Sequence, residues 1–501
     1  MTDRYEAPGE RRHLKSINEY LDALAEHDDL ARVDAPVDLN LELGAGARYA
    51  FENNLPAQYF TNITGFPGYR FLGGLAPYSS DARHRWGRVA LALGLPWNTH
   101  PLAILDRLLA VDFDTDLIAP VVVPDRSGRK LHDTVDLYDI PSPMLHEGDG
   151  GDYLNTIGTM IATTPDGSWT NWHVCRVMRV DAQRLTIWTR DFQHFGMIYE
   201  MWKEVGKPME FALALGVEPA ATVLSGGRAA PEHVDEAAFL GGWFGEPLEV
   251  TRAFTVDHNV PATAQVVIEG HINIEERAPE GPMGEYPGYL IPDAIDLELV
   301  GHVTAISSVP EPILATVPAG KPVDDDHTIN HIGQSVVHTR TLRDAGLPVE
   351  HVWVPPEGAN QFAVVTVTKD WQASWNSDAQ ALIRRITDTL IERVPLTMAL
   401  ARILVVENDI DPTDLRDVMW ALASRVRPGS DLVLTDRPLA SLSPLFSPYE
   451  RETFRGPLVV HNGLIAGAAT RSVPSTFQAV YPEAVKAKIE TLVEANLVGA
   501  K

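Results

Sequence analysis

The chain has 501 residues, of which 45% are hydrophobic and 22% are charged, and its formal net charge is -27. This length predicts two or three domains, and the acidic balance argues against nucleic acid and against an anionic membrane surface as partners, because both require a basic face. The single cysteine, Cys175, excludes an intramolecular disulfide and a zinc site built from several cysteines. The N-terminus lacks the apolar core of a signal peptide, and no apolar run reaches the ~18 residues of a membrane span, so we expect a cytoplasmic protein.

Helical patterns dominate the N-terminal part of the chain. Residues 16–26 combine a capping box, formed by Ser16 and Glu19, with an apolar stripe at helical spacing. Two more helices are predicted at residues 81–93 and 101–110.

Short apolar or alternating runs between turn signals follow over residues 157–305, and they predict mainly strands. Helices interrupt these strands near residues 195–204 and 234–240. Residues 305–309 and 312–315 are predicted to pair as a hairpin.

From Pro318 onward, predicted helices alternate with predicted strands, which favours a separate α/β domain. The two long helices are expected at residues 328–346 and 377–393. The accompanying strands are predicted at residues 351–354, 362–368 and 401–406. Further helices are predicted at residues 414–423 and 482–496.

A segment dense in proline and glycine, residues 277–289, carries Glu280 and Glu285. Its prolines exclude a regular helix, and its glycines permit backbone angles that other residues avoid. A strand-like run, residues 264–269, leads into it, so we predict a shaped loop at a sheet edge. Carboxylates in such a loop are either solvated or held for catalysis.

Asn171, Trp172 and Arg176 lie on a predicted strand, in which alternate side chains share a face. An arginine on a half-buried strand needs an anionic partner, which is either a fixed carboxylate or a ligand. The neighbouring Cys175 is either a nucleophile or a small core residue.

Gln193 and His194 directly precede a predicted helix, where a histidine is a metal ligand, an anion contact or a structural residue. Ser225 begins a Ser-Gly-Gly-Arg turn whose backbone amides can wrap a phosphate. Glu236 lies on a helix rich in alanine and phenylalanine, either on a solvated face or in a site. Asn171, His194 and Glu236 together offer nitrogen and oxygen ligands that suit a hard divalent cation.

In this order, these motifs resemble those of the UbiD-type decarboxylases, on the ferulic and cinnamic acid decarboxylase side of that family. The similarity extends over residues 16–430. The matching motifs are Asn171-Trp172 with Arg176, Gln193-His194, Glu236, Glu280-Gly281-Pro282 with Gly284-Glu285 and Gly288-Tyr289, Asp324-Asp325-Asp326-His327-Thr328, and residues 405–411 with 418–421.

The resemblance implies an α+β fold in which a split β-barrel-like flavin-binding domain is joined by a helix to a C-terminal α/β oligomerisation domain. The implied boundaries are residues 1–120 for an N-terminal α/β segment, 121–318 for the flavin domain, 319–480 for the oligomerisation domain and 481–501 for a C-terminal helix. A homodimer is the implied assembly.

The resemblance also implies prenylated FMN as cofactor, supplied by a prenyl-flavin synthase, together with Mn²⁺ or Mg²⁺ and K⁺. Asn171, His194 and Glu236 would bind the divalent ion, and Trp172, Ser225 and Glu236 would form the potassium site. The residues expected to contact the cofactor are Asn171, Val174, Arg176, Gln193, His194, Ser225 and Glu236. The family's late lysine, which reaches the cofactor phosphate, is missing from residues 455–460, where Arg455 is the candidate substitute.

By the same resemblance, Arg176, Glu280 and Glu285 form the catalytic network. Arg176 would hold the substrate carboxylate, Glu285 would donate the proton that replaces CO₂, and Glu280 would orient Arg176. The flavin would accept the electrons that the departing CO₂ leaves behind.

Residues near the resembling motifs suggest which acid is used. The expected substrate pocket consists of Tyr286, Thr328, Asn330 and His331. Asn330 and His331 can hydrogen-bond a ring NH or hydroxyl, or they are simply polar residues in the first turn of a helix.

We therefore expect reversible non-oxidative decarboxylation of a heteroaromatic acid of the pyrrole- or indole-carboxylate kind, with the acid and CO₂ as small-molecule partners. Cinnamic-type and hydroxybenzoic acids are the alternative substrates. A metal-dependent hydrolase and a non-catalytic flavin-binding protein are the alternatives of other classes.

Overall fold

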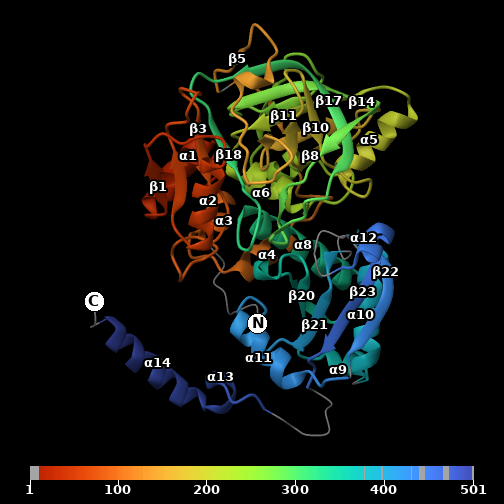
Figure 1. The fold of residues 1–501 in the computed structure, drawn as a ribbon. Coiled ribbons are helices and arrows are strands. Elements are labelled where there is room, and N and C mark those ends of the chain that lie inside the picture. The colour runs from red at the N-terminus through yellow and green to blue at the C-terminus, as the bar shows by residue number, and fades with distance from the viewer. Residues whose placement is uncertain are drawn as a thin grey trace.

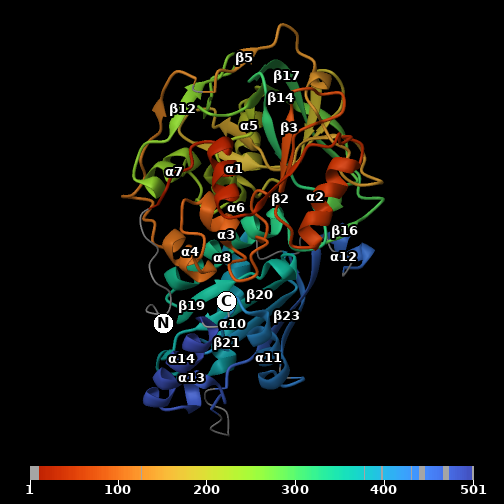
Figure 2. The same cartoon turned by 90° about the vertical axis from the view of Figure 1, so that its left-hand side faces the viewer.

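The computed structural model describes residues 11–125, 127–376, 378–395, 399–429, 431–438, 446–465 and 473–498. In Figure 1 the red N-terminal part lies beside the yellow and green central part, and the blue C-terminal part lies below both. Helix α8 (Asp325–Asp344) lies between the upper and lower parts in Figure 1 and in Figure 2.

The N-terminal part contains a small sheet of order β1-β2-β3-β18 covered by helices. Its strands are β1 (Leu30–Val33), β2 (Ala57–Phe60), β3 (Arg70–Gly73) and β18 (Ile313–Thr316), and its helices are α1 (Ile17–Glu26), α2 (Glu42–Glu52), α3 (Gly87–Ala92) and α4 (Pro101–Leu109). The predicted cap of α1 is confirmed, because Ser16 Oγ accepts a hydrogen bond from the backbone N–H of Glu19 at 3.2 Å.

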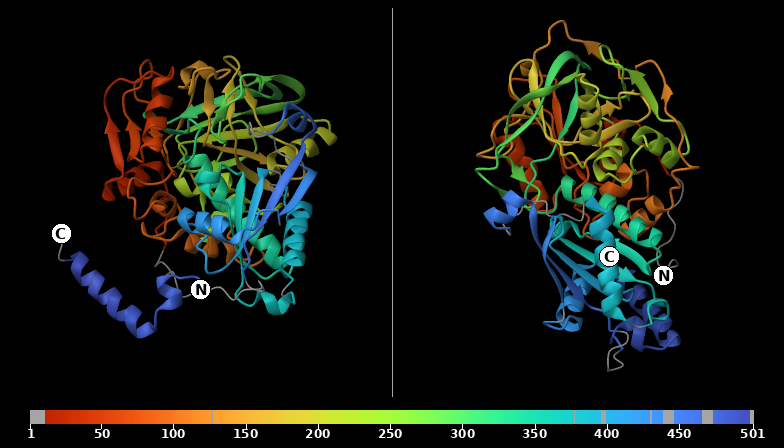
Figure 3. Two further views of the ribbon diagram at one scale, coloured as in Figure 1. Left: turned by 60° about the horizontal axis from the view of Figure 1, so that its bottom comes forward. Right: turned by 90° about the vertical axis from the view of Figure 1, so that its right-hand side faces the viewer.

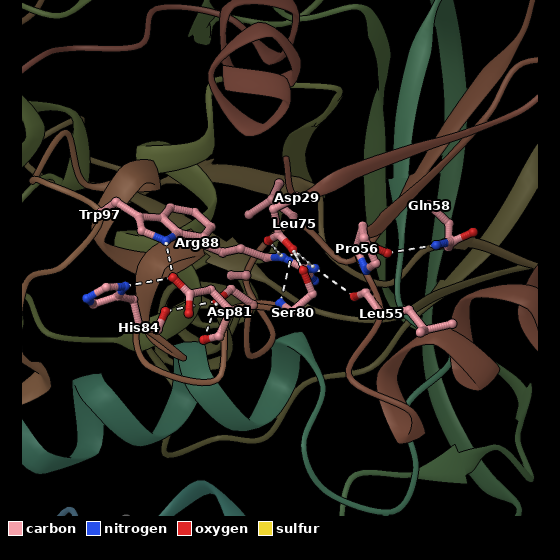
Figure 4. A network of polar contacts seen from close by, with 12 residues as sticks. Asp29, Leu55, Pro56, Gln58, Leu75, Ser80, Asp81, His84, Arg88 and Trp97 are labelled. Carbon is pink, nitrogen blue, oxygen red and sulfur yellow. Dashed lines mark hydrogen bonds and ion pairs between the residues drawn. The ribbon is translucent and has the colours of Figure 1, made fainter. Parts of the chain in front are cut away.

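A buried ion pair fixes this part internally (Figure 4). Arg88 donates from Nε to Asp29 Oδ2 at 2.6 Å and from Nη2 to Leu55 O at 2.9 Å. Ser80 donates its hydroxyl to Asp29 Oδ1 at 2.5 Å. Both charged side chains are 1% exposed, so removing either partner would leave an uncompensated buried charge.

The central part is a long curled sheet of order β6-β9-β10-β17-β14-β11-β7-β8, with β5 pairing β17. Its strands are β5 (Lys130–Leu131), β6 (Tyr153–Asn155), β7 (Thr159–Thr163), β8 (Thr170–Val174), β9 (Val177–Arg179), β10 (Arg184–Ile187), β11 (Met209–Leu215), β14 (Val266–Glu280) and β17 (Asp296–Ser308). Alternating apolar residues bury its inner face against α5 (His194–Glu204), and α6 (Pro219–Gly227) and α7 (Glu236–Phe244) pack beside β8.

Smaller elements complete the central part. A three-stranded sheet of order β13-β12-β4 consists of β4 (Val121–Val122), β12 (Glu249–Arg252) and β13 (Asn259–Pro261). A two-stranded pair consists of β15 (Gly284–Glu285) and β16 (Tyr289–Leu290). The 3₁₀ turn is η1 (Leu137–Asp139).

The C-terminal part is built on a mixed sheet of order β19-β20-β21-β23-β22, whose central strands are continuous apolar runs buried on both faces. Its strands are β19 (Val349–Trp353), β20 (Phe362–Val367), β21 (Arg402–Glu407), β22 (Leu432–Pro438) and β23 (Arg455–Asn462). Its helical elements besides α8 are η2 (Pro356–Gly358), α9 (Trp371–Ser374), α10 (Ala379–Arg393), α11 (Leu415–Arg425) and α12 (Pro448–Thr453).

Two helices, α13 (Phe477–Val480) and α14 (Glu483–Val498), follow the C-terminal sheet. Helix α14 projects from the body of the molecule in Figure 1 and in the left view of Figure 3. Among the described residues, the helices are all too short or too polar to cross a bilayer.

Three local predictions from the sequence are wrong. The expected hairpin of residues 305–315 does not form, because β17 pairs with β14 and β10 whereas β18 joins the N-terminal sheet beside β3. The helix expected at residues 81–93 is confined to α3, since Asp81 closes a turn by accepting from Arg83 N at 2.9 Å. The Ser-Gly-Gly-Arg sequence at Ser225 is the last turn of α6 and not a free turn.

The proline-glycine segment is also more regular than predicted. Strand β14 continues through Pro279 to Glu280, and it pairs with β17 over this stretch. The loop proper is residues 281–283, after which Gly284 and Glu285 form β15. Glu280 and Glu285 are thus fixed by two different strands.

Candidate active site

Arg176 lies at the centre of a buried ionic network. It occupies the short gap between β8 and β9, so the strand alternation predicted from Asn171 stops before it. Its Nε donates to Glu280 Oε1 at 2.9 Å, and its Nη2 donates to Glu280 Oε2 at 2.8 Å. This is a two-point contact, which fixes the plane of the guanidinium as well as its position.

Glu285 holds the other side of the guanidinium, where its Oε1 accepts from Arg176 Nη1. Glu280 is 1% exposed and Glu285 is 9% exposed. Burial by itself opposes the charge of Arg176, but Glu285 and Glu280 together raise the pKa of Arg176 above its ordinary value. The ring of Trp188 lies 5.1 Å below the guanidinium carbon and adds a cation–π contact. The sequence-predicted catalytic residues are thus in direct contact.

Residues 149–153 hold the two carboxylates in place. The hydroxyl of Tyr153 donates to Glu280 Oε1 at 2.8 Å, and Asp149 Oδ1 accepts from the backbone N–H of Gly284 at 2.9 Å. A Cβ atom on Gly150 would lie 2.0 Å from the carbonyl oxygen of Gly281, so only glycine allows this close approach. No sequence motif marks these supporting residues.

A second cluster is built where α7 begins against β8. Glu236 accepts from the backbone N–H of Trp172 at 2.7 Å and from Asn171 Nδ2 at 2.9 Å. Burial raises the pKa of Glu236 to about 8, and Asn171 Oδ1 is buried without a hydrogen-bond partner. A buried carboxylate beside an unpaired amide oxygen fits a cation, because such a cation would satisfy both.

His194, the first residue of α5, lies near this cluster through Trp169, whose ring centroid is 5.0 Å from that of His194. Burial, and then the charge of Arg228, lowers the pKa of His194 to about 4, so the ring is neutral and keeps a lone pair for a metal. The part of the chain that the structure describes holds no group of three or more His, Cys, Asp and Glu side chains suited to a metal. The predicted set draws its third ligand from Asn171.

The C-terminal end of α6 packs against β8 and α8. A Cβ atom on Gly226 would lie 2.7 Å from Ile329 Cγ2 and 3.4 Å from Val174 Cγ2. The hydroxyl of Ser225 donates to the carbonyl oxygen of Ala221. Gly226 therefore lies in close contact with Val174 of β8 and Ile329 of α8.

Arg228 is a site residue that the sequence analysis missed. It caps α6 in the left-handed conformation, with φ of 54°, and its Nε is buried without a hydrogen-bond partner. Burial lowers the pKa of Arg228, and its charge acts on His173, His194 and Cys175. An unpaired buried guanidinium nitrogen fits an anionic group such as a phosphate. A buried Gly-Gly-Arg at a helix end was the available signal.

Gln193 and Cys175 have structural roles in this arrangement. Gln193 Oε1 accepts from the backbone N–H of Arg190 at 2.9 Å, which leaves its Nε2 as the polar group for a ligand. Cys175 is buried, and burial raises the pKa of its thiol to about 12. Of the two alternatives for this residue, the structure therefore favours a small core residue over a nucleophile.

The four predicted pocket residues do not share one surface. Asn330 and Tyr286 are half-buried. Thr328 is fully buried, and its hydroxyl donates to Ala76 O at 2.6 Å. His331 is fully buried too, and burial lowers its pKa to about 3. Of the four, Asn330 and Tyr286 are the two that remain partly accessible.

Arg455 lies on β23 in the C-terminal sheet and is exposed. Its Nε donates to Asp436 Oδ1 at 2.5 Å. The role of Arg455 as the substitute for the expected lysine therefore remains a prediction. The guanidinium of Arg228, by contrast, has a buried Nε.

Comparison with protein families matches all three parts of the chain. Residues 21–108 match the 3-octaprenyl-4-hydroxybenzoate carboxy-lyase N-terminal domain, residues 123–322 match the Rift-related domain of that family, and residues 327–460 match its C-terminal domain. The chain belongs to the UbiD family of carboxy-lyases. The predicted family, enzyme class and α+β fold are confirmed.

Among characterised relatives, this UbiD-family chain is 36% identical to the pyrrole-2-carboxylic acid decarboxylase of Pseudomonas aeruginosa over 96% of the chain and 97% of that protein. It is 31% identical to ferulic acid decarboxylase 1 of Saccharomyces cerevisiae over 94% of the chain and 96% of that protein.

Two solved structures share the fold. The vanillic acid decarboxylase of Sedimentibacter hydroxybenzoicus in closed form superposes with a TM-score of 0.80, at 22% identity, over 97% of this chain and 99% of that one. An evolved dimeric form of the UbiD-class enzyme HmfF from Pelotomaculum thermopropionicum, in complex with prFMN, gives a TM-score of 0.73 at 24% identity, over 94% of this chain and 99% of that one.

Proposed function

We propose that this UbiD-family enzyme catalyses the reversible non-oxidative decarboxylation of a heteroaromatic acid of the pyrrole-2- or indole-carboxylate class, with prenylated FMN as cofactor. The observation that carries the proposal is the buried network in which Glu280 and Glu285 hold Arg176 from two sides. The relative named for pyrrole-2-carboxylic acid supports the substrate class. Cinnamic-type and hydroxybenzoic acids are the alternative substrates.

The chain's own residues bind the acid and move the proton. Arg176 offers a permanent positive charge for the substrate carboxylate, and Glu280 keeps its guanidinium in one plane. Glu285 delivers a proton to the carbon that CO₂ leaves, and it takes that proton back in the carboxylation direction. Burial of both carboxylates excludes water from the proton transfer. Bound prenylated FMN supplies the electron sink that this reaction requires.

Asn171, His194 and Glu236 would hold a divalent ion, Mn²⁺ or Mg²⁺, at the flavin phosphate. Their fit rests on the unpaired Asn171 Oδ1, the neutral His194 ring and the buried Glu236 carboxylate. Trp172, Ser225 and Glu236 would form the potassium site, and a prenyl-flavin synthase would supply the cofactor. The partly unpaired Arg228 adds positive charge for the phosphate.

Asn330 is the residue that would select a ring N–H. Its Nδ2 donates to the carbonyl oxygen of Asp326 at 2.9 Å, so the amide presents Oδ1, which is an acceptor. A pyrrole or indole nitrogen carries a matching donor, whereas a cinnamic acid does not. This geometry favours the heteroaromatic class over cinnamic acid, whereas a hydroxybenzoic acid also offers a donor through its hydroxyl group.

The active assembly would be a homodimer formed through the C-terminal part. Helix α14 projects from the body (Figure 3). It exposes apolar side chains that a second copy of the chain would cover. These exposed residues are Val485, Ile489, Leu492 and Val493.

The test is co-expression with a prenyl-flavin synthase, followed by measurement of CO₂ release from pyrrole, indole, cinnamic and hydroxybenzoic acids. We expect turnover with the NH-bearing rings, and a loss of at least about 100-fold in Glu285→Gln. The matched control is Glu275→Gln, an exposed position on the same β14 strand as Glu280, which should keep wild-type turnover.

Three results would contradict the proposal. Flavin-loaded protein that releases CO₂ from none of the acids would exclude the decarboxylase. Hydrolytic activity with Mg²⁺ or Mn²⁺ in flavin-free protein would favour the metal-dependent hydrolase. Wild-type turnover in Glu285→Gln would remove Glu285 as the proton donor.

A further inference from the structure

A chain of buried polar contacts runs from α2 to the strand that carries Glu285. Arg48 of α2 donates from Nη1 to Asp324 Oδ2 at 2.7 Å, and Asp324 is fully buried. His327 Nδ1 lies 2.6 Å from the other oxygen of the same carboxylate. His327 Nε2 then donates to the carbonyl oxygen of Tyr286 at 2.6 Å. Because Tyr286 directly follows Glu285, the contacts end at the carbonyl group one residue beyond the proposed proton donor.

The contacts of His327 fix the orientation of its ring. Nδ1 accepts from the backbone N–H of Asp324 at 3.1 Å and lies 2.6 Å from the carboxylate of the same residue, while Nε2 donates to the carbonyl oxygen of Tyr286. Burial disfavours a charged ring, but the neighbouring Asp324 carboxylate outweighs burial and raises the pKa of His327. The hydrogen bond from Arg48 to Asp324 is charge-assisted, so this end of the chain of contacts is held strongly.

The far end of this chain of contacts is itself anchored. Besides Asp324, Arg48 donates to the carbonyl oxygens of Pro318 at 3.1 Å and Lys321 at 2.6 Å. These residues precede α8, so one side chain of the N-terminal part fixes the whole connection between the flavin domain and α8.

The strand that carries Glu285 depends on contacts from outside its own hairpin. Strand β15 has two residues and pairs with the equally short β16. On one side Asp149 accepts from Gly284 N at 2.9 Å, and on the other side His327 holds the carbonyl oxygen of Tyr286. Such a short hairpin has little stability of its own, so these two contacts fix the backbone around Glu285, while the ion pair with Arg176 holds its carboxyl group.

We propose that Arg48, Asp324 and His327 form a positioning relay that fixes the Glu285 carboxyl for proton transfer, and thereby make the N-terminal helix α2 part of the catalytic apparatus. The proposal rests on the proposed decarboxylase function. None of the three residues touches the reacting atoms. They act by holding the carbonyl group of Tyr286, the residue after Glu285. A displacement of about 1 Å at a proton donor can cost about 100-fold in rate.

The relay also has a plainly structural duty, because His327 completes the capping box of α8, where Asp324 N lies 3.1 Å from Nδ1. The test variant must therefore keep the cap. His327→Gln does so, since glutamine at the third helical position serves the same box, while it removes the ring whose Nε2 reaches the carbonyl oxygen of Tyr286. Its matched control is His338→Gln, which changes a second fully buried histidine of α8, one whose Nδ1 contact is to Gln334 O.

Three measurements separate positioning from general stability. In flavin-free protein, amide hydrogen exchange of residues 284–290 should accelerate about 10-fold in His327→Gln and stay unchanged in His338→Gln. In the flavin-loaded enzyme, kcat should fall about 10- to 100-fold with an unchanged KM. Arg48→Met should lower kcat in the same way, and the double variant Arg48→Met/His327→Gln should be no slower than His327→Gln alone.

Wild-type exchange and wild-type kcat in His327→Gln would overturn the relay, and so would fully additive losses in the double variant. Equal effects in His338→Gln would show that α8 stability alone is responsible. The exchange measurement needs no turnover, so it decides on the relay even if no acid is decarboxylated, whereas wild-type inactivity on every acid would count against the proposed function alone.

Discussion

Asp325, the first residue of α8, has a fully buried carboxyl group. Its Oδ1 accepts from the backbone N–H of Ala76 at 2.6 Å, while its Oδ2 is buried without a hydrogen-bond partner. Burial raises the pKa of Asp325 to about 7. Above about pH 7, the folded protein therefore holds an ionised Asp325 carboxylate in which only Oδ1 accepts a hydrogen bond.

This gives a pH-dependent prediction for Asp325→Asn. Between about pH 4, the unfolded pKa, and about 7, the folded Asp325 binds a proton that the unfolded chain releases, so stability falls by up to about 4 kcal/mol as pH rises through this window. Asparagine keeps the acceptor for Ala76 and carries no charge. We expect Asp325→Asn to raise the free energy of unfolding at pH 8 by about 2 kcal/mol and to change it little at pH 5.

The measurement is denaturant unfolding at both pH values. Asp344→Asn, at the exposed end of the same helix, is the control and should behave as wild type. An equal shift of Asp325→Asn at pH 5 and pH 8 would contradict the buried-charge explanation.

The residues in contact with Arg176 were predictable because the chemistry restricts their types and order. Glu280 and Glu285 carry the charges that a buried arginine needs, and the structure places both against it. Tyr153 and Arg228 were not predictable, since a tyrosine hydroxyl or a helix-capping arginine becomes informative only when its burial and its partner are known.

At the scale of elements, helices with clear caps were predictable and long-range strand pairing was not. The cap at Ser16 depends on neighbouring residues, and it forms as expected. The partner of β18 is β3, which lies more than two hundred residues earlier, and no local pattern distinguishes it from the nearby β17. Strand β14 continues through its one proline, Pro279. Proline has no amide hydrogen to donate, but the residues on either side of it, Ala278 and Glu280, still pair with β17.

The crossing of α6 and α8 depends on two glycines. A Cβ atom on Gly333 of α8 would lie 1.6 Å from the carbonyl oxygen of Gly227, whereas a Cβ on Gly227 would meet its nearest atom, Ile329 O, at 3.2 Å. The crossing also positions Arg228, the residue that follows Gly227 and that we propose adds positive charge for the cofactor phosphate.

We therefore predict that Gly333→Ala lowers the free energy of unfolding by about 2 kcal/mol or more, although alanine is the better helix former by about 1 kcal/mol. Gly227→Ala is the matched control, with a cost below about 1 kcal/mol. Urea unfolding of both variants is the measurement. A higher free energy of unfolding in Gly333→Ala would contradict the prediction, because it would mean that α6 and α8 can move apart without a loss of stability.

At the scale of the whole molecule, the proposed active site draws on all three parts of the chain. The central part supplies Arg176 and both glutamates, α8 supplies His327, and α2 supplies Arg48. The position of α8 between the upper and lower parts (Figure 1) makes it the element through which the C-terminal part acts on the site. Assembly through that part would therefore stabilise the catalytic geometry.

The projecting α14 provides a test of this assembly. Ile489 and Leu492 are 40% and 49% exposed, and both belong to one apolar face of the helix. We expect Ile489→Asp/Leu492→Asp to convert a dimer into monomers in light scattering, because two buried carboxylates without partners cost several kcal/mol at an interface. Thr491→Asp adds a carboxylate on the opposite side of α14 and should leave the dimer intact. A monomeric wild-type enzyme, or an intact dimer with both aspartates present, would exclude α14 from the interface.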